Sequence, residues 1–320
     1  MAPTFDVAVM HDFFVDRLVH TKSLHKMIGM LSEKATAGGG GLHGVPQEEV
    51  RGGNAVNLAH ALARLGLRTL LITHSDRNYE PLLRRTFEGL KAELRVKPTP
   101  AGLTVAFEEK VNVMIGDSRG ASDFGPSILD ESDWRALENS RVVCSVNWAA
   151  NLRGTELLVA LRKRLGSEKT IFIDPADFRD RVPQFKELLK KIAERHLVDW
   201  VSMNEQEGIA SARSLGIGTG DMGRMCRELA GRLGVVFDLH AVKRSYTSEG
   251  TRLASAAVVK ARSRRLTGAG DVWDAGAILG RLKGLDEVPR LRLANRAARL
   301  YLESEGLMPP TREQIGPISN

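Results

Sequence analysis

Short apolar runs alternate with amphipathic stretches along most of the chain. Apolar runs predict buried strands, and an apolar residue at every third or fourth position predicts a helix that covers them. The apolar runs occupy 5–10, 67–75, 142–146, 170–173, 200–203 and 235–240. The helix-period stretches occupy 54–65, 154–165, 183–197, 221–233 and 290–305, and a hairpin is expected over 244–259. Because strands and helices alternate, the pattern predicts an α/β fold with a mostly parallel sheet covered by helices.

Two parts of the chain depart from this alternation. Residues 17–50 contain four consecutive glycines at 38–41 and little helical periodicity beyond Lys34. They predict a flexible lid, a small accessory sheet or a disordered insertion. Residues 104–116 contain two short alternating stretches, which predict a hairpin of the same small sheet. We therefore expect one domain spanning 1–320, with a β lid built from about 17–50 and 104–116.

Composition and charge limit the function further. The 320 residues are 42% apolar and 27% charged, which is typical of a soluble globular protein. There is no apolar run of about 18 residues, so we expect no membrane span. The N-terminus lacks the order of a secretory signal, which favours the cytoplasm. The net charge of +7 is spread along the chain and aromatic residues are only 5%, so we expect no nucleic-acid partner.

The stretch from Leu266 to Gly276 carries the strongest chemical signal. Its glycines precede apolar residues at helical spacing, so it predicts a glycine-rich turn that opens a helix. The first backbone N–H groups of a helix have no partner within it, and the helix dipole is positive at that end. The turn at Gly268, Ala269 and Gly270 therefore predicts an anion site, for which phosphate is the obvious ligand.

Asp271 follows directly after this turn. A carboxylate beside an anion site suits a general base, which takes the proton of an attacking hydroxyl while the N–H groups stabilise charge on a transferring phosphoryl group. The position also suits a simple helix cap, because acidic residues are favoured in the first turn. The turn alone leaves both interpretations open.

A second glycine motif opens the first predicted helix. Gly52 and Gly53 allow the backbone to approach a ligand closely. Asn54 is predicted to cap the helix, and Gly66 to end it. Asn57 lies one turn into the helix, and its amide offers both a donor and an acceptor. Such a pair suits the hydroxyl groups of a sugar-like molecule.

Two acidic residues follow the first predicted strand. Asp12 and Asp16 come after the apolar run at 5–10, and ligands of open α/β sheets gather at the carboxyl ends of strands. Either acid could hold a substrate hydroxyl, and either could only cap a turn. For Asp16 we favour the ligand role.

Two later strands also end in polar groups. Asn204 and Glu207 lie three residues apart, which suits the water shell of a magnesium ion and suits a capping box equally well. Arg179 and Arg181 follow the strand at 170–173. They suit a phosphate already carried by the substrate, but pairing with the aspartates around them is favoured.

Taken together, these motifs resemble those of the ribokinase-like, or PfkB, family of carbohydrate and nucleoside kinases. Residues 267–271 look like its C-terminal signature, and residues 52–57 like its N-terminal one. Asp16, which precedes the segment where the family has its β lid, and the pair of Asn204 and Glu207 stand in the family's order. The resemblance spans nearly the whole chain and implies a ribokinase-like sheet of Rossmann type with a small β lid.

The resemblance also implies roles for individual residues. Asp271 would be the base, and the N–H groups of Ala269, Gly270 and Asp271, in the turn with Gly268, would form the anion hole. The acceptor would be held by Asp12, Asp16, Gly53, Asn54 and Asn57. The nucleotide would be held by Thr267, Asn204, Glu207 and Asn295, with Asn204 and Glu207 positioning Mg²⁺ through water.

The implied function is magnesium-dependent transfer of the γ-phosphoryl group of ATP, or of another nucleotide, to a hydroxyl of a sugar, polyol or nucleoside. Members of the family often pair through the lid, which implies a homodimer.

The chain departs from the family after the apolar run at 235–240. The family usually has a Thr-x-Gly pattern and a further glycine there, beside the nucleotide phosphates, whereas this chain has Asp238, His240 and Lys243. An acid near a triphosphate would be repulsive unless metal or lysine offsets it. The donor is therefore open, and a non-catalytic sensor that retains the fold is an alternative. His11 stands where a glycine is common, which would narrow the acceptor pocket.

Overall fold

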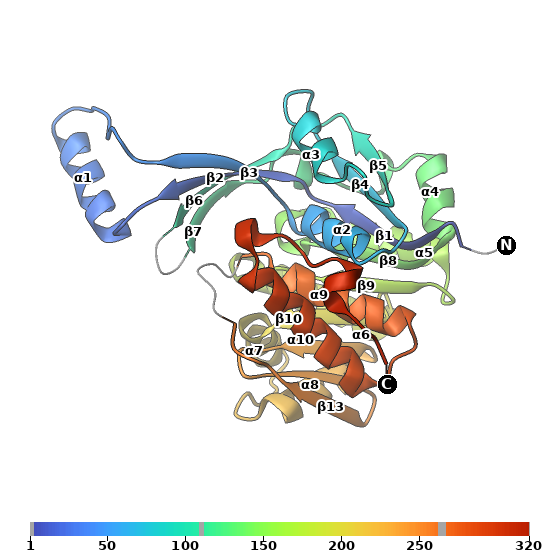
Figure 1. Ribbon diagram of the computed structural model, residues 1–320. Coiled ribbons are helices and arrows are strands. Elements are labelled where there is room, and N and C mark those ends of the chain that lie inside the picture. Colours follow the sequence, from blue (N-terminus) through green and yellow to red (C-terminus); the bar gives the residue numbers. More distant parts are fainter. Residues whose placement is uncertain (1–2, 109–111, 262–266, 320) are drawn as a thin grey trace.

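Nine strands form the central sheet of the computed structural model, which describes residues 3–108, 112–261 and 267–319 (Figure 1). Their order is β13-β12-β11-β10-β9-β8-β1-β4-β5. The strands from β11 to β5 are parallel, and β12 and β13 form an antiparallel edge, so the mostly parallel sheet is confirmed. Their bounds are β1 (Phe5–His11), β4 (Thr69–His74), β5 (Ala92–Lys97), β8 (Ser140–Val146), β9 (Thr170–Asp174), β10 (Trp200–Asn204), β11 (Val236–His240), β12 (Arg244–Glu249) and β13 (Arg252–Ala257).

Both faces of this sheet are covered by helices. Successive residues of a strand point to opposite faces, so Ala8 and Met10 of β1 belong to one hydrophobic core, and Val7 and Val9 to the other. The helices on the first core are α4 (Glu131–Glu138), α5 (Gly154–Leu165), α6 (Val182–Arg195), α7 (Glu205–Ser214) and α8 (Met222–Leu233). Those on the second are α2 (Asn54–Arg64), α3 (Glu80–Thr86), α9 (Ala269–Leu282), α10 (Glu287–Glu303) and α11 (Arg312–Ile315).

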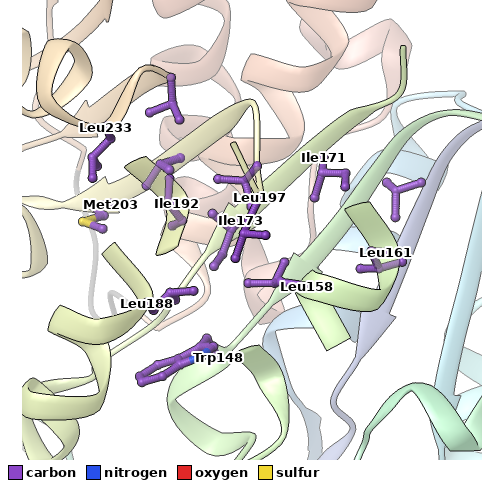
Figure 2. Packing of buried hydrophobic residues seen from close by; sticks show 14 of the residues in the cluster. Trp148, Leu158, Leu161, Ile171, Ile173, Leu188, Ile192, Leu197, Met203 and Leu233 are labelled. Atoms are coloured by element: carbon purple, nitrogen blue, oxygen red, sulfur yellow. The ribbon is translucent and has the colours of Figure 1, made fainter. Parts of the chain in front are cut away.

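Burial on both faces explains why the parallel strands are continuous apolar runs rather than alternating ones. Figure 2 shows part of the first core, where Ile171 and Ile173 of β9 lie among leucines of α5 and α6. The chain continues from β1 to β4 on one side and later places β8 on the other side of β1. In open α/β sheets, ligands bind at the carboxyl ends of the strands near such a reversal.

A second, four-stranded sheet projects from the central one (Figure 1). Its order is β3-β2-β6-β7, and its strands are β2 (Phe14–His20), β3 (Gln47–Gly52), β6 (Gly102–Glu108) and β7 (Asn112–Asp117). The predicted small sheet is confirmed, and both expected segments contribute to it. Between β2 and β3 lies α1 (Leu24–Thr36), capped by Ser23, which the sequence pattern did not predict and which lies at the far end of this sheet in Figure 1.

The other predicted elements are confirmed with small shifts of their ends, but the pattern missed β5, α3, α4, α7 and α11. For α4 a signal was available, because Asp130 and Asp133 form a capping box at its start. Within the described residues, no helix has both the length and the apolar character needed to span a membrane.

Candidate active site

A cavity of about 840 Å³ opens at the carboxyl ends of β9, β10 and β11 and extends to the start of α9. Its volume lies in the usual range for small-molecule sites. The predicted site residues in its wall are Asn54, Asn204, Glu207, Gly268, Ala269, Gly270, Asp271 and Asn295. The other predicted ones, Asp12, Asp16, Gly53, Asn57 and Thr267, do not belong to the described lining.

The turn before α9 has the geometry of an anion site. Gly268 has a φ of 80°, in the left-handed region that favours glycine, and a Cβ atom there would lie 2.6 Å from the Tyr301 hydroxyl. That hydroxyl donates to the Thr267 carbonyl over 2.9 Å, which fixes the turn against α10. The helix begins at Ala269, and Gly268 gives its first N–H groups no side-chain cap. Ala269 and Gly270 belong to the cavity wall.

Asp271 is the acid of this turn, and its side chain is bonded to α2 rather than to its own helix. Asn54 Nδ2 donates to Asp271 Oδ1 over 3.0 Å, and Asn57 Nδ2 donates to Oδ2 over 2.9 Å. Asp271 is 5% exposed. Burial raises the pKa of its carboxyl well above the ordinary value, and the charge of Asp174 adds to the rise. A buried carboxylate is thus fixed in place beside this turn.

Two predictions for the start of α2 need correction. Asn54 does not cap this helix, because its side chain is turned to Asp271 and Gly53 is the capping position. Asp12 takes the capping role from outside the helix: it accepts from the backbone N–H groups of Asn54 and Ala55 over 2.9 and 2.8 Å, and from Asn147 Nδ2 over 2.8 Å. No part of Asp12 is exposed, so the structure favours the cap over the expected contact with substrate.

The glycine pair serves two different purposes. A Cβ atom at Gly52 would overlap the carboxylate of Asp16, so the glycine gives this acid its place beside α2. Gly53 has a φ of 100°, and a Cβ atom there would lie 2.8 Å from the Asp12 carbonyl. Asp16 is therefore close to the start of α2, as the acceptor role requires.

Arg51 and His60 are candidates that the motif analysis did not identify. Arg51 donates through Nη1 to Asn57 Oδ1, and its Nη2 lies 2.8 Å from His60 Nδ1. Burial and the charge of Arg51 lower the pKa of His60 to about 3, so the ring is neutral and Nδ1 can accept. Asp16 and Asp271 both act electrostatically on Arg51. A cation directly before the glycine pair was the available signal.

For Asn204 and Glu207, the capping-box interpretation is confirmed. They form the capping box of α7, because Asn204 Oδ1 accepts from the Glu207 N–H over 3.0 Å and Glu207 Oε2 accepts from the Asn204 N–H over 2.9 Å. They also line the cavity beside Asp174. Burial, with the charge of Asp174, raises the pKa of Glu207 to about 8.

Asp274 is a further buried acid, one turn beyond Asp271. Ser202 Oγ donates to its Oδ1 over 2.5 Å, and its Oδ2 has no hydrogen-bond partner among the described residues. Burial raises the pKa of Asp274 well above the ordinary value, and Asp174 adds to the rise. The acids Asp174, Glu207, Asp271 and Asp274 thus lie in one region where charge is disfavoured, and a cation in the cavity would relieve this.

Asn295 lines the cavity, and it also bonds to a residue of the neighbouring helix. Its Oδ1 accepts from Trp273 Nε1 over 2.8 Å, and its Nδ2 donates to the Ala257 carbonyl over 3.2 Å. The side chain therefore fixes Trp273 and the end of β13 at the cavity wall.

The expected clash between Asp238 and nucleotide phosphates does not arise. Asp238 is fully buried, and Arg290 donates to it through two bonds of 2.6 and 2.8 Å, while Trp200 Nε1 donates over 2.9 Å. This acid therefore stabilises the core. The alternative of a non-catalytic sensor rested mainly on this departure from the family, so it loses its main support.

The two arginines after β9 do not form a second phosphate site. Arg179 pairs with Asp177, as the favoured interpretation held. Arg181 donates instead to backbone carbonyls, including those of Trp148 and Asn151. His11 is 1% exposed and packs against an aromatic ring, so it has little surface with which to narrow a pocket.

The α/β sheet, the small β sheet and the glycine-rich turn at the cavity define the class: a phosphotransferase with an alcohol group as acceptor. The sequence profile of the pfkB family of carbohydrate kinases matches residues 31–314, and the chain belongs to this family. It is therefore a carbohydrate or nucleoside kinase in the general sense. No curated protein sequence matches the chain.

Solved structures agree with the family in fold. A probable sugar kinase from Rhizobium etli CFN 42 has a TM-score of 0.80 at 17% identity, covering 98% of this chain and 97% of that one. Ribokinase from Arabidopsis thaliana, solved with ribose and ATP, has a TM-score of 0.78 at 20% identity, covering 98% of each chain. Adenosine kinase from Sinorhizobium meliloti has a TM-score of 0.77 at 19% identity, covering 95% of this chain and 96% of that one.

Proposed function

We propose that this protein transfers the γ-phosphoryl group of ATP to a hydroxyl of a sugar, polyol or nucleoside, and that it requires Mg²⁺. The observation that carries the proposal is the placement of Asp271. A buried carboxylate, fixed by two amides, lies beside the N-terminus of α9, to which Gly268 gives no side-chain cap, in a cavity of nucleotide size.

Asp271 takes the proton of the acceptor hydroxyl in the proposed reaction. The hydroxyl oxygen forms a bond to the γ-phosphorus, the bond from that phosphorus to the bridging oxygen breaks, and ADP leaves. Burial makes Asp271 a stronger base than an exposed aspartate, because its charged form loses hydration. The bonds from Asn54 and Asn57 keep its oxygens in a fixed direction, so little reorganisation accompanies proton transfer.

The N–H groups at the start of α9 stabilise the transferring group. Charge spreads over the equatorial oxygens of the phosphoryl group in the transition state. Gly268 gives no side-chain cap to the N–H groups of Ala269, Gly270 and Asp271. The positive end of the helix dipole adds to the stabilisation that these groups provide.

The acceptor is bound between α2 and the small sheet in this proposal. Asp16, Gly53 and Asn57 are assigned to the acceptor hydroxyls, with Asn54 close by. Their support is the position of Asp16 over Gly52 and the bond from Asn57 to Asp271. The small sheet acts as a lid that excludes water from the cavity.

The residues around the cavity suit a magnesium ion held mainly through water and phosphate oxygens. Oxygen donors are the ligands this ion prefers, and Asp174, Asn204 and Glu207 supply them in one wall. Within the described part of the chain, no group of three or more His, Cys, Asp or Glu side chains is placed to hold a metal directly. The ion would neutralise phosphate charge when bound, and the buried acids Asp174 and Glu207 would gain a counter-charge.

Nucleotide turnover in the presence of Mg²⁺ tests the proposal. Purified protein is given ATP or ADP with a panel of sugars, polyols, nucleosides and their phosphates. We expect turnover with one acceptor class and a loss of about a thousandfold in Asp271→Asn, because general-base catalysis contributes roughly 10²–10⁴-fold. Asp130→Asn is the matched control, since Asp130 caps the distant helix α4 and asparagine caps equally well. Equal turnover in Asp271→Asn and Asp130→Asn would refute the proposal.

A further inference from the structure

His240 lies at the carboxyl end of β11, beside the anion turn. It is the direct neighbour of Asn204 in the parallel register of β10 and β11. A Cβ atom built on Gly270 would lie 3.3 Å from its Cε1 and 3.8 Å from its Nε2. The imidazole edge is therefore in contact range of the backbone whose N–H groups form the anion site. Asn204 and Glu207 line the same cavity as His240.

The ring of His240 is fixed, but one of its nitrogen atoms lacks a partner. The ring packs on Trp273 with a centroid distance of 5.1 Å and an interplanar angle of 32°. Nε2 is buried and has no hydrogen-bond partner among the described residues. An unpaired buried polar atom costs free energy unless a ligand or water satisfies it. His240 is one of the residues that line the cavity of about 840 Å³, so a ligand in the cavity would lie beside this ring.

We propose that His240 Nε2–H donates a hydrogen bond to a phosphate oxygen of the donor nucleotide, next to the N–H groups of the α9 turn, and so sets the affinity for the phosphate chain. This inference rests on the proposed function, because it places the triphosphate in the same cavity. Phosphate oxygens are acceptors only, so they select the tautomer that carries its proton on Nε2.

The charge state of the ring agrees with a donor that is neutral before binding. Burial lowers the pKa of His240 to about 4, although the carboxylate of Asp238 acts in the opposite direction. A neutral ring leaves the unliganded cavity without an extra buried charge. The neutral ring retains one N–H group for the ligand. A glycine or threonine at this position would not place a donor at the same point.

Direct binding of nucleotides distinguishes this role from a structural one. Calorimetry measures the Kd of ATP, ADP and AMP with Mg²⁺ for the full chain and for the variants His240→Phe, His240→Gln and His240→Gly. Phenylalanine keeps a ring against Trp273 but has no donor, whereas the glutamine amide places an N–H near the position of Nε2. We expect His240→Phe to weaken ATP binding about tenfold and AMP binding less than twofold, because tenfold corresponds to the loss of about 1.4 kcal/mol, near the lower end for a hydrogen bond to a charged group. His240→Gln should bind ATP within about threefold of the unaltered protein.

Several outcomes would overturn the inference. Unchanged ATP binding by His240→Phe would show that Nε2 makes no contact, and equal loss for ATP and AMP would indicate a structural role. Tighter ATP binding by His240→Gly would show that the ring obstructs the phosphates. If the unaltered protein binds no nucleotide, the proposed function fails as well. Binding that is strong in the unaltered protein and equal in all variants removes only the role of His240.

Discussion

At the scale of single residues, Asp271 depends on the side chains around it for its chemistry. Its own helix contributes the anion turn, while α2 contributes the two amides that orient the carboxylate. Burial raises its pKa, and so does the nearby Asp174. A base with a raised pKa is more effective near neutral pH than an exposed aspartate would be.

This pKa shift predicts how the rate depends on pH. Asp271 must be deprotonated to accept a proton, and its folded-state pKa is raised. Activity should therefore be lost as the pH falls through that raised value, well above the value of about 3.9 for an exposed aspartate, with the rate falling about tenfold per pH unit below it. The measurement is kcat/KM for the acceptor between pH 5 and 9.

Glu207 is the competing acid, because its pKa is also raised, to about 8. Glu207→Gln removes this carboxyl group. The kcat/KM of the variant, taken relative to the variant's own maximum, should still fall as the pH becomes acidic. A profile that is flat down to pH 5, or a limb that vanishes in Glu207→Gln, would contradict the assignment to Asp271.

Arg51 is expected to act through Asn57 on the base. Arg51→Met removes the bond that fixes the Asn57 amide, so Asn57 no longer orients Asp271. We expect kcat to fall about 10–100-fold, on the order of one lost charged hydrogen bond, with the KM for ATP within about twofold. The kcat of Arg51→Lys should lie between those of the unaltered protein and Arg51→Met, because one ammonium group cannot reach both Asn57 and His60 in the same geometry.

Steady-state kinetics at saturating acceptor measure this effect. A wild-type kcat in Arg51→Met would contradict it. A rise confined to the KM of the acceptor would instead assign Arg51 to direct contact with substrate.

At the scale of secondary-structure elements, α9 and α10 pack closely and fix the cavity wall. A Cβ atom at Gly276 would lie 2.8 Å from the Ala294 Cα atom, so only glycine allows this approach. The buried pair of Asp238 and Arg290 then ties α10 to β11, and Arg290 also donates to Thr247 of β12. Sequence proximity indicated an acid near the phosphates, but the side chain of Asp238 points into the core because successive residues of a strand alternate in direction.

Breaking this pair should destabilise the fold strongly. Arg290→Met leaves the buried carboxylate of Asp238 without its counter-charge, and we expect the free energy of unfolding to fall by about 3–5 kcal/mol. Arg281→Met is a matched control, because both guanidinium groups lie 5.2 Å from the Trp200 ring but Arg281 is exposed. For Arg281→Met we expect the free energy of unfolding to fall by less than about 1 kcal/mol. Chemical denaturation measures both, and equal losses would show that the ion pair contributes little.

At the scale of the whole molecule, the small sheet and helix α1 present apolar side chains to solvent. The exposed ones are Ile28, Met30 and Leu31 of α1 and Val113, Met114 and Ile115 of β7. Exposed apolar groups gathered on one part of a molecule mark an interaction surface. We expect a second copy of the chain to cover this surface, because homodimers with two-fold symmetry are the commonest assembly.

Sedimentation velocity tests the pairing. We expect a dimer at micromolar concentration and at least about tenfold weaker pairing in Ile115→Lys, since burying an unpaired charge is costly. Leu152→Lys is the control, because Leu152 is 67% exposed on the central part of the molecule, outside the small sheet. A monomeric unaltered protein, or an Ile115→Lys dimer of full strength, would contradict this expectation.

The sequence by itself determined the features that depend on short stretches of chain. The apolar runs predicted the parallel sheet, and the glycine motifs predicted the turns at Gly53 and Gly268, whose positive φ values exclude most other residues. Backbone preference and strand or helix periodicity act over a few residues, so they can be recognised without knowing the packing. Helix α1 was not predicted, and Met27 is its only buried residue among those described.

Only the tertiary structure decided which side chains meet. Asn54 and Asn57 lie 217 and 214 residues from Asp271 in the sequence, and the packing of α2 on α9 brings them into contact. The same packing makes Asp12 a cap, pairs Asp238 with Arg290, and leaves His240 Nε2 without a hydrogen-bond partner in the part of the chain that the structure describes. Such contacts depend on strand order and helix placement, because residue type alone does not say whether a polar group finds its partner nearby, across the core or in a ligand.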